Sequence, residues 1–202
     1  MIAFDTSREI PMRKLGLAAV IFLVAAIFAV APAMAADEKK ADDTYSMDEI
    51  VGKAKGFFGS TTKGLAEAIE KVFSDYGRPN AYIVGEEAGG AIGVGLRYGH
   101  GMLNKKGEKE RQIYWQGPTI GFDLGGNASK VFALIYKLPN IDAIFQRYPG
   151  VEGSVYVVAG VSVNYQQSGD TIIAPIRTGV GWRAGVNAGY IHFTREKHLN
   201  PF

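Results

Sequence analysis

Six polar side chains that could bind a ligand fall on a face of the chain that is otherwise rich in glycine. Residues 91–101 and 172–190 alternate with a period of two, and glycine occupies many positions of one parity. Two arginines six residues apart, Arg177 and Arg183, could clamp a lipid headgroup or a sugar phosphate through bidentate hydrogen bonds. We predict a ligand-binding groove or lumen there, and the candidates are Arg97, Asp123, Lys137, Arg177, Arg183 and Asn187.

The plainer alternative is that this glycine-rich face is ordinary solvent-exposed surface. No ligand would then be involved, whereas in the predicted groove Asp123 could pair with one of the arginines.

Residue patterns typical of catalysis are missing from the sequence. The chain has no cysteine, which excludes thiol catalysis, and its three histidines never occur four residues apart. Residues 89–93 are glycine-rich, but no Gly-Lys-Ser/Thr follows, so a phosphate loop is not supported. Glu86 and Glu87 are adjacent, and neighbouring side chains on a strand point to opposite faces. We expect no enzymatic activity, no metal and no cofactor.

Composition narrows the class of protein further. The chain carries 22 Lys and Arg against 20 Asp and Glu, whereas a nucleic-acid-binding protein would show a strong basic excess. It contains 26 glycines in 202 residues. Glycine inside a strand costs stability but permits the sharp coiling and close backbone approach that a small closed barrel needs.

Strand-like segments dominate from residue 81 onward. Turn signals at 105–107 and 167–170 separate alternating runs, and the run 172–190 is too long for one strand, so we expect a turn near 185–187. Residues 154–165 are rich in valine at both parities and predict a strand buried on both faces. The fold class is therefore mainly β: a small soluble antiparallel β-barrel with one or two N-terminal helices and a short helix near 140–147.

The predicted N-terminal helices lie in residues 46–78. Ser46 and Glu49 have the spacing of a capping box, and residues 65–73 carry apolar side chains at helical intervals. Residues 79–202 would form the barrel domain.

The first 35 residues have the three parts of a secretory signal peptide: basic residues at 13–14, an apolar stretch at 15–30 and Ala-Met-Ala before Ala36. We predict cleavage after Ala35, a flexible linker at 36–45 and a periplasmic location. The alternative is a retained membrane anchor, although the apolar stretch is shorter than the roughly 20 residues that a spanning helix needs.

Two segments resemble the exported envelope integrity proteins of the EipA type. They are residues 114–127, YWQGPTIGFDLGGN, and residues 175–183, PIRTGVGWR, followed by NAGY at 187–190. The resemblance covers about residues 75–194. It implies a periplasmic β-barrel that maintains the cell envelope, without established catalytic residues. A patchier similarity to lipid-binding SYLF domains lies in the tryptophan, proline and glycine pattern.

The leading functional hypothesis is a periplasmic barrel that supports envelope integrity by binding an envelope component, whether lipid, glycan or protein. We expect no nucleic-acid partner and no membrane span after cleavage. Two alternatives remain: a small integral outer-membrane β-barrel, and a glycan- or peptide-acting enzyme that uses Asp123 with Glu86 or Glu87.

Overall fold

The structure is a computed structural model that describes residues 43–60, 63–123, 129–178, 189–198 and 200, with the backbone alone for 91–94 and 119–123. These residues all belong to the unit Asp43–Phe202. The predicted signal peptide and most of the predicted linker lie outside the described residues. None of the described helices has the length and apolarity required to span a membrane.

Two helices precede the strands, as the sequence predicts. Helix α3 (Met47–Phe58) begins with a capping box: the Ser46 hydroxyl accepts from the Glu49 amide at 3.2 Å, and the Glu49 carboxylate accepts from the Ser46 amide at 2.7 Å. These bonds satisfy amide groups that the helix itself cannot pair. Helix α4 (Lys63–Tyr76) buries one apolar stripe, formed by Leu65, Ala68, Ile69 and Val72.

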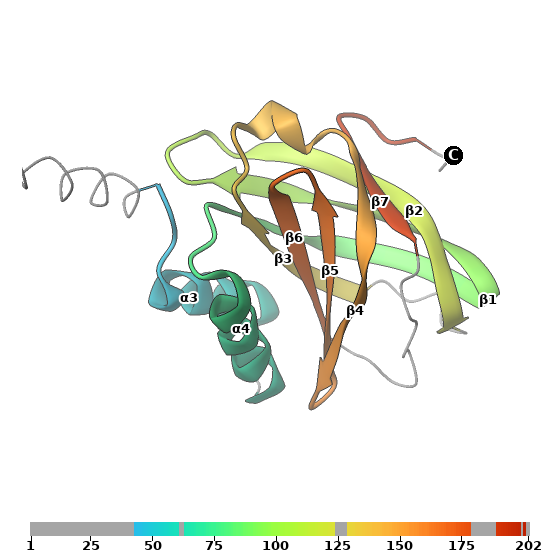
Figure 1. The fold of residues 1–202 in the computed structure, drawn as a ribbon, viewed down its shortest axis with the longest axis horizontal. Helices are drawn as coiled ribbons and strands as arrows, with labels where there is room; N and C mark the ends of the chain where they lie inside the picture. Colours follow the sequence, from blue (N-terminus) through green and yellow to red (C-terminus); the bar gives the residue numbers. More distant parts are fainter. Residues whose placement is uncertain (1–42, 61–62, 124–128, 179–188, 199, 201–202) are drawn as a thin grey trace, which may run out of the picture. The chain divides into compact units, whose positions relative to one another are not determined.

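The strands close into a barrel in the order β1-β2-β7-β4-β5-β6-β3 (Figure 1). Each neighbouring pair is antiparallel, which confirms the predicted fold class. The strands are β1 (Ala81–Lys105), β2 (Arg111–Asp123), β3 (Ser129–Tyr136), β4 (Arg147–Val158), β5 (Val161–Ser168), β6 (Thr171–Thr178) and β7 (Tyr190–Thr194).

Strand β1 folds back on itself, so the barrel has eight antiparallel strand segments within the described residues. The first half of β1 pairs with β3, and the second half pairs with β2. The Cα of Gly101 lies 2.9 Å from where a Cβ on Gly85 would stand, and the Cα of Arg97 lies 3.3 Å from the same point on Gly89. The alternation over residues 91–101 predicts one continuous strand there and gives no sign of this reversal.

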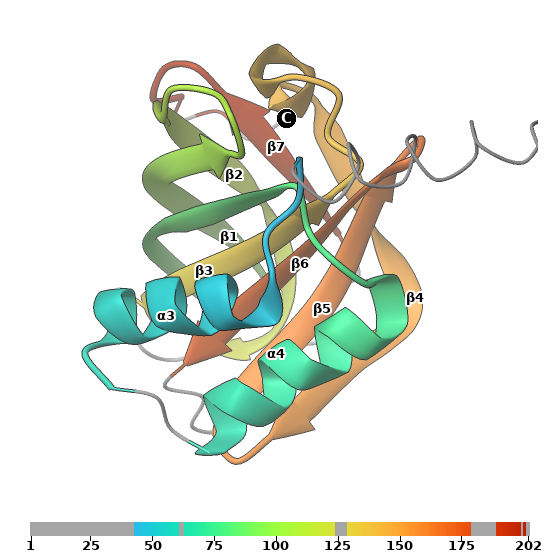
Figure 2. The ribbon, with the colours of Figure 1, turned by 90° about the vertical axis from the view of Figure 1, so that its left-hand side faces the viewer.

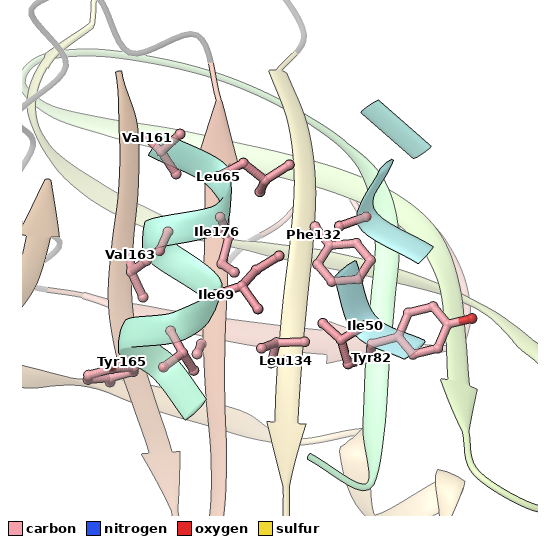
Figure 3. Close-up of a cluster of buried hydrophobic side chains, with 14 of the residues drawn as sticks. Ile50, Leu65, Ile69, Tyr82, Phe132, Leu134, Val161, Val163, Tyr165 and Ile176 are labelled. Atoms are coloured by element: carbon pink, nitrogen blue, oxygen red, sulfur yellow. The ribbon is translucent and has the colours of Figure 1, made fainter. Parts of the chain in front are cut away.

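The barrel separates two apolar clusters. One fills its interior and includes Ile83, Ile113, Trp115, Ile135, Tyr148, Ile173 and Phe193. The other lies outside β3, β5 and β6, where α3 and α4 cover the barrel (Figure 2). Figure 3 shows Leu65 and Ile69 of α4 pointing toward Leu134, Val163 and Ile176 on those strands. Residues of opposite parity on one strand thus enter different clusters.

The predicted turns are confirmed at 105–107 and 167–170, and the predicted short helix is a 3-10 turn at Ile141–Ile144. The single strand expected at 154–165 is wrong. The chain turns at Ala159 and Gly160, both with positive φ, and forms the β4–β5 hairpin. Of the run 172–190, strand β6 covers residues 172–178 and β7 begins at Tyr190, whereas the turn predicted near 185–187 lies outside the described residues.

Candidate functional site

Two of the six predicted binding residues lie together inside the barrel. Arg97 on β1 is 3 % exposed, and the Arg177 side chain on β6 is 13 % exposed. Both belong to the parity that includes the glycines, so in the described strands this face is the barrel interior and not solvent-exposed surface. The positive charges of both arginines interact with the carboxylate of Glu87.

The other four candidates are not brought to this cluster by the described structure. Lys137 is exposed just after β3, with a φ of 55°. Asp123 ends β2 opposite Ala91, and its side chain is not described. Arg183 and Asn187 lie outside the described residues.

Glu87 is the centre of a buried polar cluster with Arg177, Trp115 and Arg97. Arg177 donates to it twice, from Nε to Oε1 at 2.9 Å and from Nη2 to Oε2 at 3.3 Å. Trp115 Nε1 donates to Oε2 at 2.8 Å. Arg97 donates from Nη2 to the carbonyl of Tyr190 at 3.2 Å. These bonds tie strands β1, β2, β6 and β7 together through the interior.

The electrostatics keep this cluster ionised at neutral pH. Burial by itself raises the pKa of Glu87, but the charges of Arg177 and Arg97 and the hydrogen bonds outweigh it and lower the pKa to about 2. Burial lowers the pKa of Arg97 to about 10, although Glu87 opposes this change. The guanidinium groups of Arg177 and Arg97 therefore already interact with groups of the protein itself.

The room left by the glycines is filled, which contradicts the predicted open groove in the described part of the barrel. The Trp115 ring packs directly on Gly99, where an added Cβ would overlap it. A Cβ on Gly117 would overlap the carbonyl of Tyr190. The cavity beside Arg177 measures about 10 Å³, close to the space of one water molecule. A headgroup does not fit there.

A larger groove, of about 400 Å³, lies on the outer face of β1 and β2. This volume is within the range of about 300–1,000 Å³ typical of ligand sites. Its lining is mostly polar and aromatic: Glu86, Ala88, Tyr98, Gly99, His100, Gln112, Tyr114, Trp115, Gln116, Lys197 and His198. Figure 1 shows β1 and β2 running side by side, and the last two lining residues come from the segment after β7.

Strand register arranges the groove residues as two adjacent rows. His100 is opposite Tyr114, and Tyr98 is opposite Gln116. The close approaches within β1 place Glu86 beside His100 and Ala88 beside Tyr98. The two tyrosines are therefore diagonal neighbours on one face, close enough for both rings to contact the same ligand.

Hydrogen bonding and burial make the groove a defined surface. Gln112 Nε2 donates to the Tyr114 hydroxyl at 3.0 Å, which holds both side chains at the rim. Gln116 is only 2 % exposed. Nearby on β7, burial together with the positive charges of Arg147 and His198 lowers the pKa of His192.

The groove offers hydrogen-bond donors and acceptors but little acid–base chemistry. Among its described lining residues, Glu86 is the single carboxylate, whereas glycoside hydrolysis usually needs two. Glu87 points to the opposite face, as the sequence predicts. No group of three or more His, Asp or Glu among the described residues could hold a metal ion.

Sequence reasoning missed the groove, although part of its signal is visible. Tyr98 and His100 share one parity in a run whose other residues of that parity are aliphatic, and Tyr114 and Gln116 repeat the pattern in the next strand. What unites these residues is the register of the β1–β2 hairpin, and Lys197 and His198 join them from beyond β7, far along the chain.

Comparison with known proteins adds a family and a neighbouring structure. The family model described as EipA, envelope integrity protein A, matches residues 43–202. The crystal structure of a beta-barrel-like, uncharacterized protein from Brucella abortus is 45 % identical, with a TM-score of 0.71; the match covers 79 % of this chain and 99 % of that one. The search of curated proteins found no match.

Proposed function

The chain belongs to the envelope integrity protein A family, and from this premise we propose that it supports the cell envelope by binding an envelope component in the groove on β1 and β2. The single observation that carries this proposal is the groove itself. It has the volume of a ligand site, and its polar and aromatic side chains converge from adjacent strands.

A periplasmic location fits both the sequence and the packing. Residues 1–35 have the pattern of a signal peptide. The apolar outer positions of β3, β5 and β6 are covered by α3 and α4, and the barrel interior is mainly apolar apart from the Glu87 ion-pair cluster. A membrane barrel has the reverse arrangement, with an apolar band facing lipid and a polar interior. These features favour a barrel that works in the aqueous part of the envelope.

Carbonate extraction of cell membranes tests the location. We expect the protein in the supernatant, and in the periplasmic fraction when the outer membrane is opened gently. Retention in the carbonate-washed pellet would support the integral outer-membrane barrel instead.

A binding role fits the groove better than catalysis. Among its described lining residues the groove presents one carboxylate, Glu86. The enzyme alternative pairs Asp123 with Glu86 or Glu87; Glu87 is bound by Arg177 inside the barrel, and the Asp123 side chain is not described. Histidines at the groove edge can donate or accept hydrogen bonds to a ligand without performing a reaction.

Complementation of a deletion strain tests the role of the groove. The double variant Gln112→Ala, Tyr114→Ala removes two groove side chains at the rim of the barrel. The matched control, Tyr76→Ala with Gln167→Ala, makes the same chemical change on α4 and in the β5–β6 hairpin. The Tyr76 ring packs on those of Tyr136 and Tyr165, so the control loses some stability as well. We expect the control to restore growth on detergent and the groove variant to fail, with both variants folded and at equal protein levels. Full restoration by the groove variant would overturn the proposal.

A further inference from the structure

The groove on β1 and β2 carries enough chemical detail to narrow the class of its ligand. Lipid, glycan and protein components of an envelope differ in what they demand of a binding surface: an acyl chain needs a continuous aliphatic wall, a phosphate needs clustered cations, and a sugar needs flat aromatic rings beside hydrogen-bonding groups. The lining residues can be compared with each requirement in turn.

The lining argues against an acyl chain. Among the described lining residues, Ala88 is the single aliphatic side chain; the Trp115 indole faces the barrel interior, Gly99 has no side chain, and the others end in hydroxyl, amide, imidazole, carboxylate or ammonium groups. Burying such groups against a hydrocarbon chain would leave them without hydrogen-bond partners, at a cost of about 1–3 kcal/mol each.

The charge of the lining argues against a strongly anionic ligand. Lys197 and Glu86 carry opposite charges, and the two described arginine candidates, Arg97 and Arg177, are turned into the barrel interior. The balance of charge suits a ligand that is neutral or nearly so.

The aromatic and amide side chains fit a sugar. Tyr98 and Tyr114 are diagonal neighbours and present two rings to one ligand, on which the C–H faces of pyranose rings can pack. Gln112 and Gln116 lie on the same strand as Tyr114, and each carries both a donor and an acceptor, which is what a sugar hydroxyl requires.

We infer that the outer groove of β1 and β2 binds a neutral glycan segment, with Tyr98 and Tyr114 as the stacking platform and Gln112 and Gln116 as hydroxyl-binding groups. The inference deepens the proposed function, on which it rests, by naming the class of envelope component.

Binding of the purified protein to an array of defined bacterial surface oligosaccharides tests this inference. We expect binding to at least one neutral oligosaccharide, and a loss of at least about tenfold in affinity in Gln112→Ala, Tyr114→Ala, with the Tyr76→Ala, Gln167→Ala control unchanged. Because the interaction would not be ionic, raising the salt from about 0.05 to 0.5 M should change the affinity by less than about twofold.

Parallel probes make the opposite outcomes informative. Binding to phosphatidylglycerol vesicles or to an array of periplasmic peptides, without binding to any glycan, would overturn the inference. So would glycan binding that the groove variant retains. If the groove variant fails in cells but no glycan binds, the proposed function survives and the glycan assignment does not. If a glycan binds through the groove but the groove variant restores growth, the glycan assignment survives and the proposed function does not.

Discussion

Arg177 and Glu87 form a bidentate ion pair inside the barrel although their strands are not neighbours. Strand β3 lies between β6 and β1, and its residue Val131 is paired with both Arg177 and Gly85. The ion pair therefore spans β3 on the interior side and joins segments that are 90 positions apart in the sequence. The ion pair thus helps to hold β6, β3 and β1 in the curvature of the barrel wall.

Replacing Glu87 with glutamine should destabilise the fold strongly. The substitution leaves Arg177 and Arg97 buried without the carboxylate that compensates them, and breaking a buried pair in this way costs about 3–5 kcal/mol. Chemical denaturation should reveal this as a lower free energy of unfolding.

The neighbouring substitution Glu86→Gln is the control, because that side chain points outward into the groove. It should change the free energy of unfolding by less than about 0.5 kcal/mol. Equal effects of the two substitutions would contradict the buried ion pair.

Acid should weaken the protein through the same carboxylate. The pKa of Glu87 is about 2 in the folded protein, below its ordinary value of 4.5. Its contribution to stability is therefore complete above about pH 4.5 and is lost as the pH falls toward 2, where the group takes up a proton in both states. This difference in pKa corresponds to roughly 3 kcal/mol. Denaturation measured at several pH values should show a steeper acid loss in the wild type than in Glu87→Gln.

A methyl group at Gly99 should damage the barrel interior. The Trp115 ring occupies the space where the Cβ of Gly99→Ala would stand, and that ring also donates to Glu87. Overpacking of this kind costs about 1–3 kcal/mol, and a displaced indole would weaken the ion-pair cluster as well. A fall in melting temperature and a change in tryptophan fluorescence should accompany it.

Gly56→Ala on α3 is the matched control for that substitution. An added Cβ there meets nothing within 4 Å, and alanine favours a helix over glycine by about 1 kcal/mol. The control should stabilise the protein slightly. A neutral result for Gly99→Ala would mean that Trp115 is free to move aside.

The elements predicted correctly from the sequence depend on residues close together in the chain. The capping box at Ser46 and the stripe of α4 involve residues three or four apart, and the β5–β6 turn has a local glycine signal at Gly169. The reversal within β1 has no such signal, because the period of two continues through it. It is defined by contacts such as Gly85 with Gly101, which only the closed barrel brings about.

The candidate site illustrates the same limit. Alternation places Arg97 and Arg177 on the glycine side, but it cannot tell whether the missing side chains leave an empty lumen or accommodate a large neighbour. Here Trp115 from β2 supplies the missing volume. Likewise, in the sequence Glu87 stands beside Glu86, and nothing there indicates Arg177 as its partner. Arg177 lies on β6 and is brought to Glu87 by the β1–β3 and β3–β6 pairings.

Truncating Ile69 should test whether the helices and the barrel fold as one unit. Ile69 on α4 is fully buried in the cluster that includes Leu134 and Ile176 of the barrel wall (Figure 3). Ile69→Ala should cost about 2–5 kcal/mol, because the cavity opens between the two layers. Val157→Ala on β4, where the side chain is 51 % exposed, should cost less than about 0.5 kcal/mol.

If α4 merely covers a barrel that is stable alone, helical signal will be lost before the aromatic signal of the barrel. We expect far- and near-ultraviolet circular dichroism to report the same unfolding transition, and Ile69→Ala to shift both signals together. The reason is that loss of α4 alone would expose the apolar outer faces of β3, β5 and β6 to water.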